Sequence, residues 1–324
     1  MKAMILAAGL GTRLKPLTDT RPKALVELSG RTLLEITLSR LRTFGIDEVI
    51  VNLHHFADMV IDYLKANKNF GMRIEVSRED VLLDTGGGLK KAAWFFLENS
   101  TSASPSRPRS TQMDEPFLLH NVDVLSTIDF ARMLQFHKER RALATLAVQA
   151  RETSRPLLFD NNLQLRGRRT SSTPVPRGSE GTTPAGPEPA ERGSAPQTTA
   201  THNPRGTTSA LPNSIGSPRS QESTASVVPK NEKNSRASAP EVPLQSLAFS
   251  GIHIISPRLL SLLTEEGIFS IIPAYLRLAA QGQPILAFRA DTYYWRDLGR
   301  PTDLAQATLD LEQKTPGGSE RNLS

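Results

Sequence analysis

The sequence predicts an α/β protein with an open, mixed and mostly parallel sheet flanked by helices. Short apolar runs of the kind buried in parallel sheets alternate along the chain with segments of helical periodicity. This alternation favours β-α-β units with right-handed crossovers. The first apolar run, at 4–8, opens directly into a glycine-containing loop. Ligands of open α/β sheets bind beyond the carboxyl ends of the strands, so a ligand site is expected at this loop.

The remaining elements follow in chain order. Strands are expected at 48–52, 72–76, 117–124, 144–148, 247–255 and 284–288, with a hairpin over 157–165. Helices are expected at 33–44, 56–65, 130–141, 259–263, 271–280 and 301–312. The three glycines within 82–91 are expected in a loop ahead of another helix through Trp94 and Phe96. Gly45 is in a C-cap position, and Gly251 inside a strand indicates a bulge or a close backbone approach.

The composition changes sharply between 168 and 243. Ser, Thr, Pro, Gly, Ala, Asn and Arg dominate there, and such a segment buries too little apolar area to offset its conformational entropy. We therefore expect one domain made of 1–167 and 244–313, interrupted by a low-complexity disordered insertion at 168–243. A surface loop is expected at 98–115 and a flexible tail at 314–324.

Composition also narrows the class of protein. The chain has no cysteine, which excludes disulfides and thiolate metal sites. It has no apolar run of about 18 residues and no signal-like start, so we expect a cytoplasmic protein without membrane insertion. The net charge is +6, but nine Lys/Arg against six Asp/Glu fall between 168 and 241, where no aromatic residues are interleaved. A nucleic-acid partner is therefore not indicated.

The loop after the first strand has the chemistry of a polyphosphate site. Gly9 and Gly11 allow backbone N–H groups to approach an anion closely. Arg13 adds a bidentate cationic fork, and Lys23 adds a point charge. A third glycine two or three positions after Gly11 is missing, and so is a Gly-Lys-Ser/Thr ending. The dinucleotide fingerprint and the Walker loop are therefore not supported.

The linked pieces Gly9-Leu-Gly11-Thr12-Arg13, Pro16-Leu-Thr18 and Pro22-Lys23 closely resemble the signature of sugar-nucleotide pyrophosphorylases. The resemblance implies a Rossmann-like, GT-A-like nucleotidyltransferase fold. It also implies that a loop around Ala8, Gly9, Gly11 and Thr12 binds nucleotide.

Four later segments are similar to elements of the same family. Thr85-Gly86-Gly87 resembles the second nucleotide loop, which meets the base and ribose, and Glu79 belongs to an acidic tripeptide common just upstream. Asn121-Val122-Asp123 resembles an Asn-Gly-Asp element that supplies a magnesium ligand, although valine replaces the glycine. Ser250-Gly251 resembles a sugar-phosphate contact. Trp295-x-Asp297-x-Gly299 resembles the element with the second magnesium-binding aspartate.

The resemblance implies a reaction and a role for each residue. Mg²⁺ would be held by Asp123 and Asp297, and a sugar 1-phosphate oxygen would attack the α-phosphorus of a nucleoside triphosphate in line, releasing pyrophosphate. Arg13 would bind the β- and γ-phosphates, and Lys23 would neutralise charge at the α-phosphate. The sugar phosphate would be bound by Asn121, Ser250 and Gly251.

The family pattern favours particular substrates. N-acetylmuramate-1-phosphate uridylyltransferases are the most similar branch and mannose-1-phosphate guanylyltransferases the next, so UTP with N-acetylmuramate 1-phosphate is expected first and GTP with mannose 1-phosphate second. No hexapeptide repeats follow residue 300, which excludes a β-helical acyltransferase domain from the sequence given. Two alternatives stay open: a non-catalytic sugar-nucleotide-binding regulatory paralogue, and a cytidylyltransferase acting on an alcohol phosphate. A monomer or homodimer is expected.

Overall fold

The computed structural model describes residues 1–98, 115–169 and 243–313. Apart from their end residues, the predicted loop at 98–115, insertion at 168–243 and tail at 314–324 lie outside these ranges. Contacts divide the chain into one unit of 1–172 with 241–324 and a second of 173–240. The description that follows concerns the first unit.

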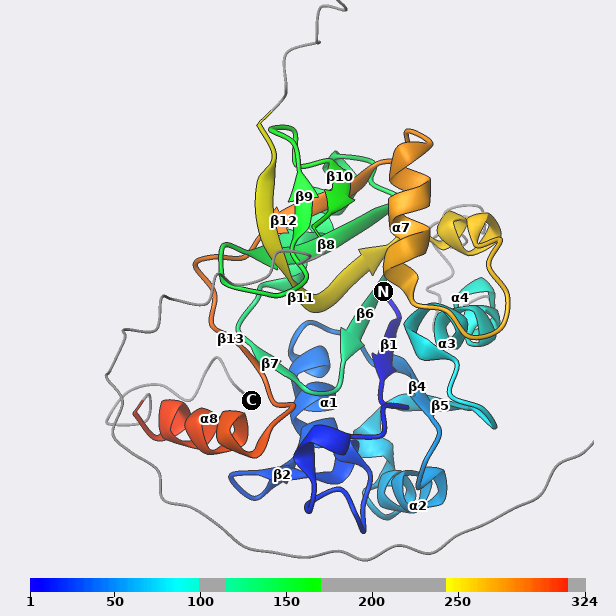
Figure 1. The fold of residues 1–324 in the computed structure, drawn as a ribbon. Coiled ribbons are helices and arrows are strands. Elements are labelled where there is room, and N and C mark those ends of the chain that lie inside the picture. Colours follow the sequence, from blue (N-terminus) through cyan, green and yellow to red (C-terminus); the bar gives the residue numbers. More distant parts are fainter. Residues whose placement is uncertain (99–114, 170–242, 314–324) are drawn as a thin grey trace, which may run out of the picture. The chain divides into compact units, whose positions relative to one another are not determined.

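A sheet of nine strands forms the centre of this unit (Figure 1). One path through it has the order β10-β9-β11-β6-β1-β4-β5, and β8 joins β11 to β12. The strands are β1 (Ala3–Leu6), β4 (Glu48–Leu53), β5 (Arg73–Arg78), β6 (Phe117–Asn121), β8 (Ala144–Gln149), β9 (Leu157–Phe159), β10 (Leu165–Arg168), β11 (Gln245–Ile255) and β12 (Ile285–Arg289). Only β10 and β11 run against the other seven strands, which confirms the predicted mixed and mostly parallel sheet.

Two short antiparallel pairs accompany the main sheet. β7 (Val124–Ser126) pairs with β13 (Trp295–Asp297), and β2 (Glu27–Leu28) pairs with β3 (Arg31–Thr32). The first of these pairs joins the end of β6 to a segment that is about 170 residues away in the sequence. It therefore brings two predicted site segments together.

Helices cover both faces of the sheet because alternate residues of each central strand point to opposite sides. Ala3 and Ile5 belong to one apolar cluster, whereas Met4 belongs to the other. The first face packs against α1 (Leu33–Thr43), α2 (Ala57–Ala66), α6 (Phe130–Glu139) and α8 (Pro301–Gln313). The second packs against α3 (Asp84–Lys91), α4 (Ala93–Leu97) and α7 (Ile271–Ala280). None of the helices in the described ranges is long and apolar enough to span a membrane.

Two local expectations are confirmed and two are wrong. Gly45 ends α1 at a φ of 69°, and Gly251 lies at a φ of 75° beside a register shift in β11, as a bulge requires. The three glycines at 86–88, however, are inside α3 and not in a loop before it, because close packing of that helix requires residues without Cβ atoms. Within the segment at 259–263, residues 259–262 belong to a 3-10 helix and not an α-helix; this helix is η4 (Pro257–Leu262), its first position is proline, and Leu263 follows its end.

Candidate active site

A cavity of about 370 Å³ lies at the carboxyl ends of four adjacent strands, β6, β1, β4 and β5. Its lining residues are Leu6, Ala7, Ala8, Gly9, Lys23, Asn52, Glu79, Leu82, Asp84, Thr85, Asn121, Val122, Asp123 and Ile268. The strand order places the residues that follow β6 on one side and those that follow β4 and β5 on the other. We call the first side, with Lys23, Asp123, Arg13 and Asp297, the charged end. The second side, with Asn52, Glu79, Leu82, Thr85 and Ile268, is the α3 end.

An ion pair between Lys23 and Asp123 marks the charged end. Lys23 lies in the 3-10 helix η2 (Lys23–Leu25) and is 8% exposed, and Asp123 lies in the turn between β6 and β7. Gly11 helps to position Lys23, because it has a φ of 65° and a Cβ there would lie 3.3 Å from the Lys23 Cβ. An ammonium group that lines a cavity can neutralise the charge of a phosphate bound there.

Asp297 reaches the same end from the distant part of the chain. Asp297 pairs with Val124 in the β13–β7 ladder, and the next residue, Leu298, donates its N–H to the Asp123 carbonyl at 2.7 Å. Burial, and then the charge of Asp123, raise the pKa of the Asp297 carboxyl above its usual range. Two carboxylates thus lie close enough to repel each other.

Arg13 approaches Asp297 because residue 299 is glycine. The Arg13 Nη2 and Asp297 Oδ2 atoms are 4.0 Å apart. A Cβ at Gly299 would come within 2.6 Å of Asp297 Oδ1 and 2.7 Å of Arg13 Nη2. Gly299 therefore leaves the space in which the guanidinium and the carboxylate meet.

The α3 end is built from polar groups that bond to one another. Asn52 Oδ1 accepts a hydrogen bond from Ala7 N at 2.8 Å, and Asn52 Nδ2 donates to Glu79 Oε1 at 2.8 Å. The other Glu79 oxygen accepts from Leu83 N at 2.9 Å. Glu79 is 2% exposed, so this network fixes the ends of β1, β4 and β5 relative to each other.

The predicted second nucleotide loop forms the start of α3, and its donors are already bonded. Gly86 N and Gly87 N donate to the Phe269 carbonyl at 2.9 and 3.1 Å. Thr85 Oγ1 accepts from Ile271 N at 3.0 Å. Gly86 and Gly87 are buried and do not line the cavity, whereas Thr85 does. In this structure the glycines serve helix packing.

The predicted sugar-phosphate residues lie on β6 and β11. Asn121 lines the cavity, and a Cβ at Gly251 would come within 2.8 Å of Asn121 Nδ2, so glycine lets β11 approach that amide. Ser250 is fully buried, and its carbonyl accepts from Trp295 Nε1 at 2.8 Å. The Arg151 guanidinium lies 3.7 Å from the centre of the Trp295 ring.

The structure thus brings together most, but not all, of the predicted site residues. Ala8, Gly9, Lys23, Glu79, Thr85, Asn121 and Asp123 line the cavity, and Arg13 and Asp297 meet beside it. Gly11 and Thr12 lie in the first loop without lining the cavity, and Ser250 and Gly251 lie behind Asn121. His253 of β11 is buried, and its Nδ1 lies 2.9 Å from the Tyr275 hydroxyl oxygen.

Sequence reasoning missed Asn52, Leu82 and Ile268. Asn52 ends an otherwise apolar strand, and this polar residue at a carboxyl end was a usable signal. Ile268 carries no local signal, because only the tertiary fold brings it to the cavity. Every other missed lining residue lies within two positions of a predicted one.

The charged end suits a divalent cation. Its donor set is two carboxylates, the oxygen ligands that Mg²⁺ prefers, and Gly299 leaves room beside Asp297 Oδ1 that a Cβ would fill. Burial and then the charge of Asp123 raise the pKa of Asp297, and a bound cation would offset both effects. Within the described ranges no group of three or more His, Asp or Glu side chains is arranged to hold a metal alone, so substrate or water oxygens would complete the coordination.

Comparison with known families gives a match over the first half of the chain. The sequence model of the nucleotidyl transferase family matches residues 2–159, a range that holds β1 to β9 and almost the whole cavity lining. This part of the chain is therefore similar to the nucleotidyl transferase family.

Individual relatives are sugar-1-phosphate nucleotidyltransferases. The chain is 50% identical over 93 residues, 28% of its length, to the N-acetylmuramate alpha-1-phosphate uridylyltransferase of Caulobacter vibrioides. It is 32% identical over 155 residues, 45% of its length, to the UTP–glucose-1-phosphate uridylyltransferase of Synechocystis sp.. It is 34% identical over 149 residues, 46% of its length, to the mannose-1-phosphate guanylyltransferase catalytic subunit beta of Xenopus tropicalis. These matches confirm the resemblance to sugar-nucleotide pyrophosphorylases, and they span 36–38% of the relatives' own lengths.

Solved structures share the fold. HddC from Yersinia pseudotuberculosis, complexed with GMP-PN, matches 96% of this chain over 99% of its own, with a TM-score of 0.57 and 18% identity. A UDP-glucose pyrophosphorylase complexed with UDP-glucose matches 97% of this chain over 98% of its own, with a TM-score of 0.59 and 14% identity. At these identities the likeness concerns the fold.

Proposed function

We propose that this protein transfers a nucleoside monophosphate from a nucleoside triphosphate to a sugar 1-phosphate, giving a nucleoside diphosphate sugar and pyrophosphate. The observation that carries the proposal is the convergence of Lys23, Asp123, Arg13 and Asp297 at one end of a cavity beyond the carboxyl ends of the strands. Two cations and two carboxylates there match the needs of phosphoryl transfer, which depends on positioning and charge stabilisation.

The chemistry balances without a protein base. An anionic oxygen of the sugar 1-phosphate forms a bond to the α-phosphorus, and the bond from that phosphorus to the bridging oxygen of the β-phosphate breaks. The leaving pyrophosphate carries away the bonding electrons. Lys23 offsets the charge that develops at the α-phosphate, and Arg13 offsets the charge on the leaving group. Ala8 and Gly9 also line the cavity, and their backbone N–H groups would bind the phosphates.

The proposal includes Mg²⁺ held by Asp123 and Asp297. When bound, it supplies charge neutralisation for the phosphate oxygens. The protein's own part is to hold the two carboxylates together, which the Leu298 N–H to Asp123 carbonyl bond and the β13–β7 ladder do.

For the substrates we propose UTP with N-acetylmuramate 1-phosphate first and GTP with mannose 1-phosphate second. The greater identity to the Caulobacter vibrioides uridylyltransferase, 50% against 34% for the Xenopus tropicalis guanylyltransferase subunit, supports this order. Asn121 and the adjacent Ser250–Gly251 stretch would contact the sugar phosphate.

The test is pyrophosphate release from the full chain, with and without Mg²⁺. The matrix pairs UTP, GTP, CTP, dTTP and ATP with N-acetylmuramate, mannose and glucose 1-phosphates and with phosphocholine. Release is expected with UTP and N-acetylmuramate 1-phosphate. It should fall at least about 100-fold in Asp123→Asn, because a charge at the reacting phosphates is lost.

Asp58→Asn is the matched control. Asp58 is an exposed carboxylate that is also paired with an arginine, Arg78 at 2.7 Å, and it lies outside the cavity lining. Its replacement should leave release unchanged. A folded chain that binds nucleotide but releases no pyrophosphate with any pair would contradict the proposal and favour the regulatory paralogue. Release with CTP and phosphocholine alone would favour the alcohol-phosphate cytidylyltransferase.

A further inference from the structure

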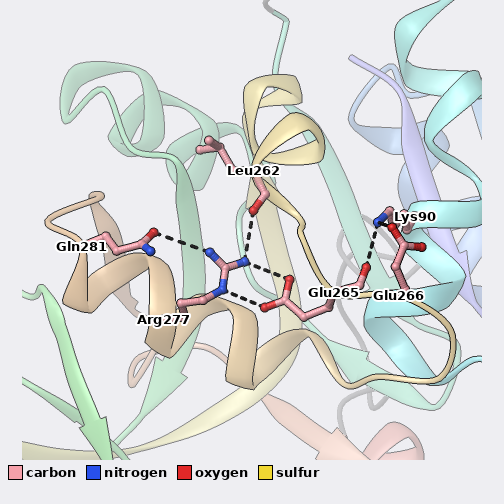
Figure 2. A network of polar contacts seen from close by, with 6 residues as sticks. All are labelled: Lys90, Leu262, Glu265, Glu266, Arg277 and Gln281. Atoms are coloured by element: carbon pink, nitrogen blue, oxygen red, sulfur yellow. Dashed lines mark hydrogen bonds and ion pairs between the residues drawn. The ribbon is translucent and has the colours of Figure 1, made fainter.

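The segment between η4 and α7, residues 263–270, is fixed in place by side chains of two helices. Arg277 of α7 donates from Nε and Nη2 to the two Glu265 carboxylate oxygens at 2.8 Å each (Figure 2). Lys90 of α3 donates to the Glu265 carbonyl at 2.7 Å and to Glu266 Oε1 at 2.6 Å. These charge-assisted bonds hold the first half of the segment, at Glu265 and Glu266.

The same segment pairs with the main chain at the start of α3. Phe269 N donates to the Leu83 carbonyl at 3.1 Å, and the Phe269 carbonyl accepts from Gly86 N and Gly87 N. A Cβ at Gly86 would lie 2.3 Å from the Phe269 ring, and one at Gly87 would lie 2.4 Å from the Gly267 carbonyl oxygen. The glycines of α3 thus let the segment lie directly against the helix.

This arrangement places Ile268 at the cavity with its side chain exposed. Ile268 is 64% exposed, the highest value among the large apolar residues of the described ranges, and it lines the same cavity as Leu82. Leu82 precedes Leu83, and Ile268 precedes Phe269, so the Phe269–Leu83 bond holds the two apolar side chains near each other. An apolar side chain held in solvent on a pinned segment has no packing role that explains it.

We propose that Ile268 and Leu82 form the apolar wall against which the base of the nucleoside triphosphate packs. The inference rests on the proposed function and adds a residue to its nucleotide site. Lys23 and Asp123 occupy the other end of the cavity, so the phosphates belong there and the base belongs at the α3 end. Planar nucleobases gain affinity by burying their faces against apolar side chains, and Ile268 offers such a surface.

The experiment measures binding of two probes to the full chain by calorimetry: UTP, and inorganic triphosphate, which has the phosphates without a base. Ile268→Ala should weaken UTP binding about tenfold, as expected for lost apolar contacts in a binding pocket. It should leave inorganic triphosphate binding unchanged. In turnover, the KM for the nucleotide should rise by a similar factor while kcat and the KM for the sugar phosphate stay within about twofold.

Ile268→Leu keeps the apolar area and should restore most of the affinity. Leu309→Ala on α8 removes a comparably exposed apolar side chain, 49% exposed, outside the cavity and should change nothing. Unchanged UTP binding in Ile268→Ala, or an equal loss of affinity for UTP and inorganic triphosphate, would overturn the apolar wall of Ile268 and Leu82. Either result would leave the proposed function intact. A wild-type chain that binds neither probe would overturn both this inference and the proposed function.

Discussion

The two ends of the cavity differ in how their polar groups are used. At the charged end, Arg13 exposes 57% of its side chain and Asp297 exposes 42%, and the two groups approach only to 4.0 Å. At the α3 end, Glu79 is 2% exposed and both its oxygens accept hydrogen bonds from neighbours. The charged end therefore retains bonding capacity for a ligand, whereas the α3 end uses its capacity to shape the cavity. Variants of the polar residues at the charged end should lose activity, and variants of the polar network at the α3 end should lose stability.

The largest effect is expected from the lysine at the charged end. Lys23→Met keeps most of the length of the side chain and removes its charge, and pyrophosphate release should fall about 100- to 1,000-fold. Lys90→Met is the matched variant on α3, outside the cavity lining, where the lysine bonds to the Glu265 carbonyl and to Glu266. Its release should fall less than about fivefold, because a partly exposed ion pair contributes little. Similar losses of pyrophosphate release in both variants would contradict the distinction between the two ends of the cavity.

The next effect is on stability. Gly87→Ala puts a Cβ 2.4 Å from the Gly267 carbonyl oxygen, a main-chain atom that cannot move alone. The free energy of unfolding should fall by about 1–3 kcal/mol, measured by urea denaturation. Gly167→Ala is the control, since its Cβ would meet Leu158 at an ordinary 3.6 Å. Equal stability of the two variants would show that α3 can move away from the 263–270 segment.

At the charged end, Gly299→Ala should lower turnover and leave stability almost unchanged, which is the opposite of the result expected for Gly87→Ala. The Cβ added at Gly299 would meet only the ends of flexible side chains, Arg13 Nη2 and Asp297 Oδ1. We expect the free energy of unfolding to change by less than about 0.5 kcal/mol. Turnover should fall about tenfold, because both groups are displaced from their positions at the phosphates. If Gly299→Ala were destabilised but retained full kcat, the charged end would serve stability and not activity.

The smallest effect is the dependence of the free energy of unfolding on pH. It arises at a buried histidine outside the cavity lining. Burial lowers the pKa of His137 to about 4, and its ring bonds Thr145 Oγ1 at 2.9 Å and Ser256 Oγ at 3.2 Å. In the unfolded chain, His137 has a pKa near 6.5. Between pH 6.5 and 4 the unfolded chain therefore binds more protons at this residue than the folded chain does. The contribution of the neutral, buried His137 to the free energy of unfolding is therefore fully present above pH 6.5, and it is lost as the pH falls toward 4.

For His137 this loss should be on the order of 1–2 kcal/mol at pH 5. Burial lowers the pKa of His120 to about 4 as well and gives the same sign. Urea denaturation at pH 7 and pH 5 measures the difference, and His137→Gln should reduce it. An unreduced difference would mean that the acid sensitivity arises elsewhere, including at the charged end.

The charged end could be predicted from the sequence because its residues carry local signals. Glycine, arginine and lysine follow a buried strand, and Asp123 and Asp297 stand at strand ends. A strand end projects its side chain to the ligand edge whatever the rest of the chain does. Most of the order of strands and helices follows from the same periodicity.

The α3 end could not be predicted in the same way. Three consecutive glycines suggest a loop when only local propensity is considered, yet packing against Phe269 and Gly267 makes them part of a helix. The partner segment is about 180 residues away along the chain, and nothing in the local pattern of either segment reveals the other. Ile268 was missed for this reason.

Strand β9 has a consequence for engineering the chain. Leu158 pairs with Gly167 of β10 on one side and with Ser246 of β11 on the other. These two strands are therefore only two inter-strand spacings apart, about 10 Å. The sheet thus fixes where the polypeptide leaves after Arg168 and where it returns at Gln245, but it does not fix the length between them. A reporter domain with neighbouring termini could be spliced between these points while every strand pairing around the cavity is kept.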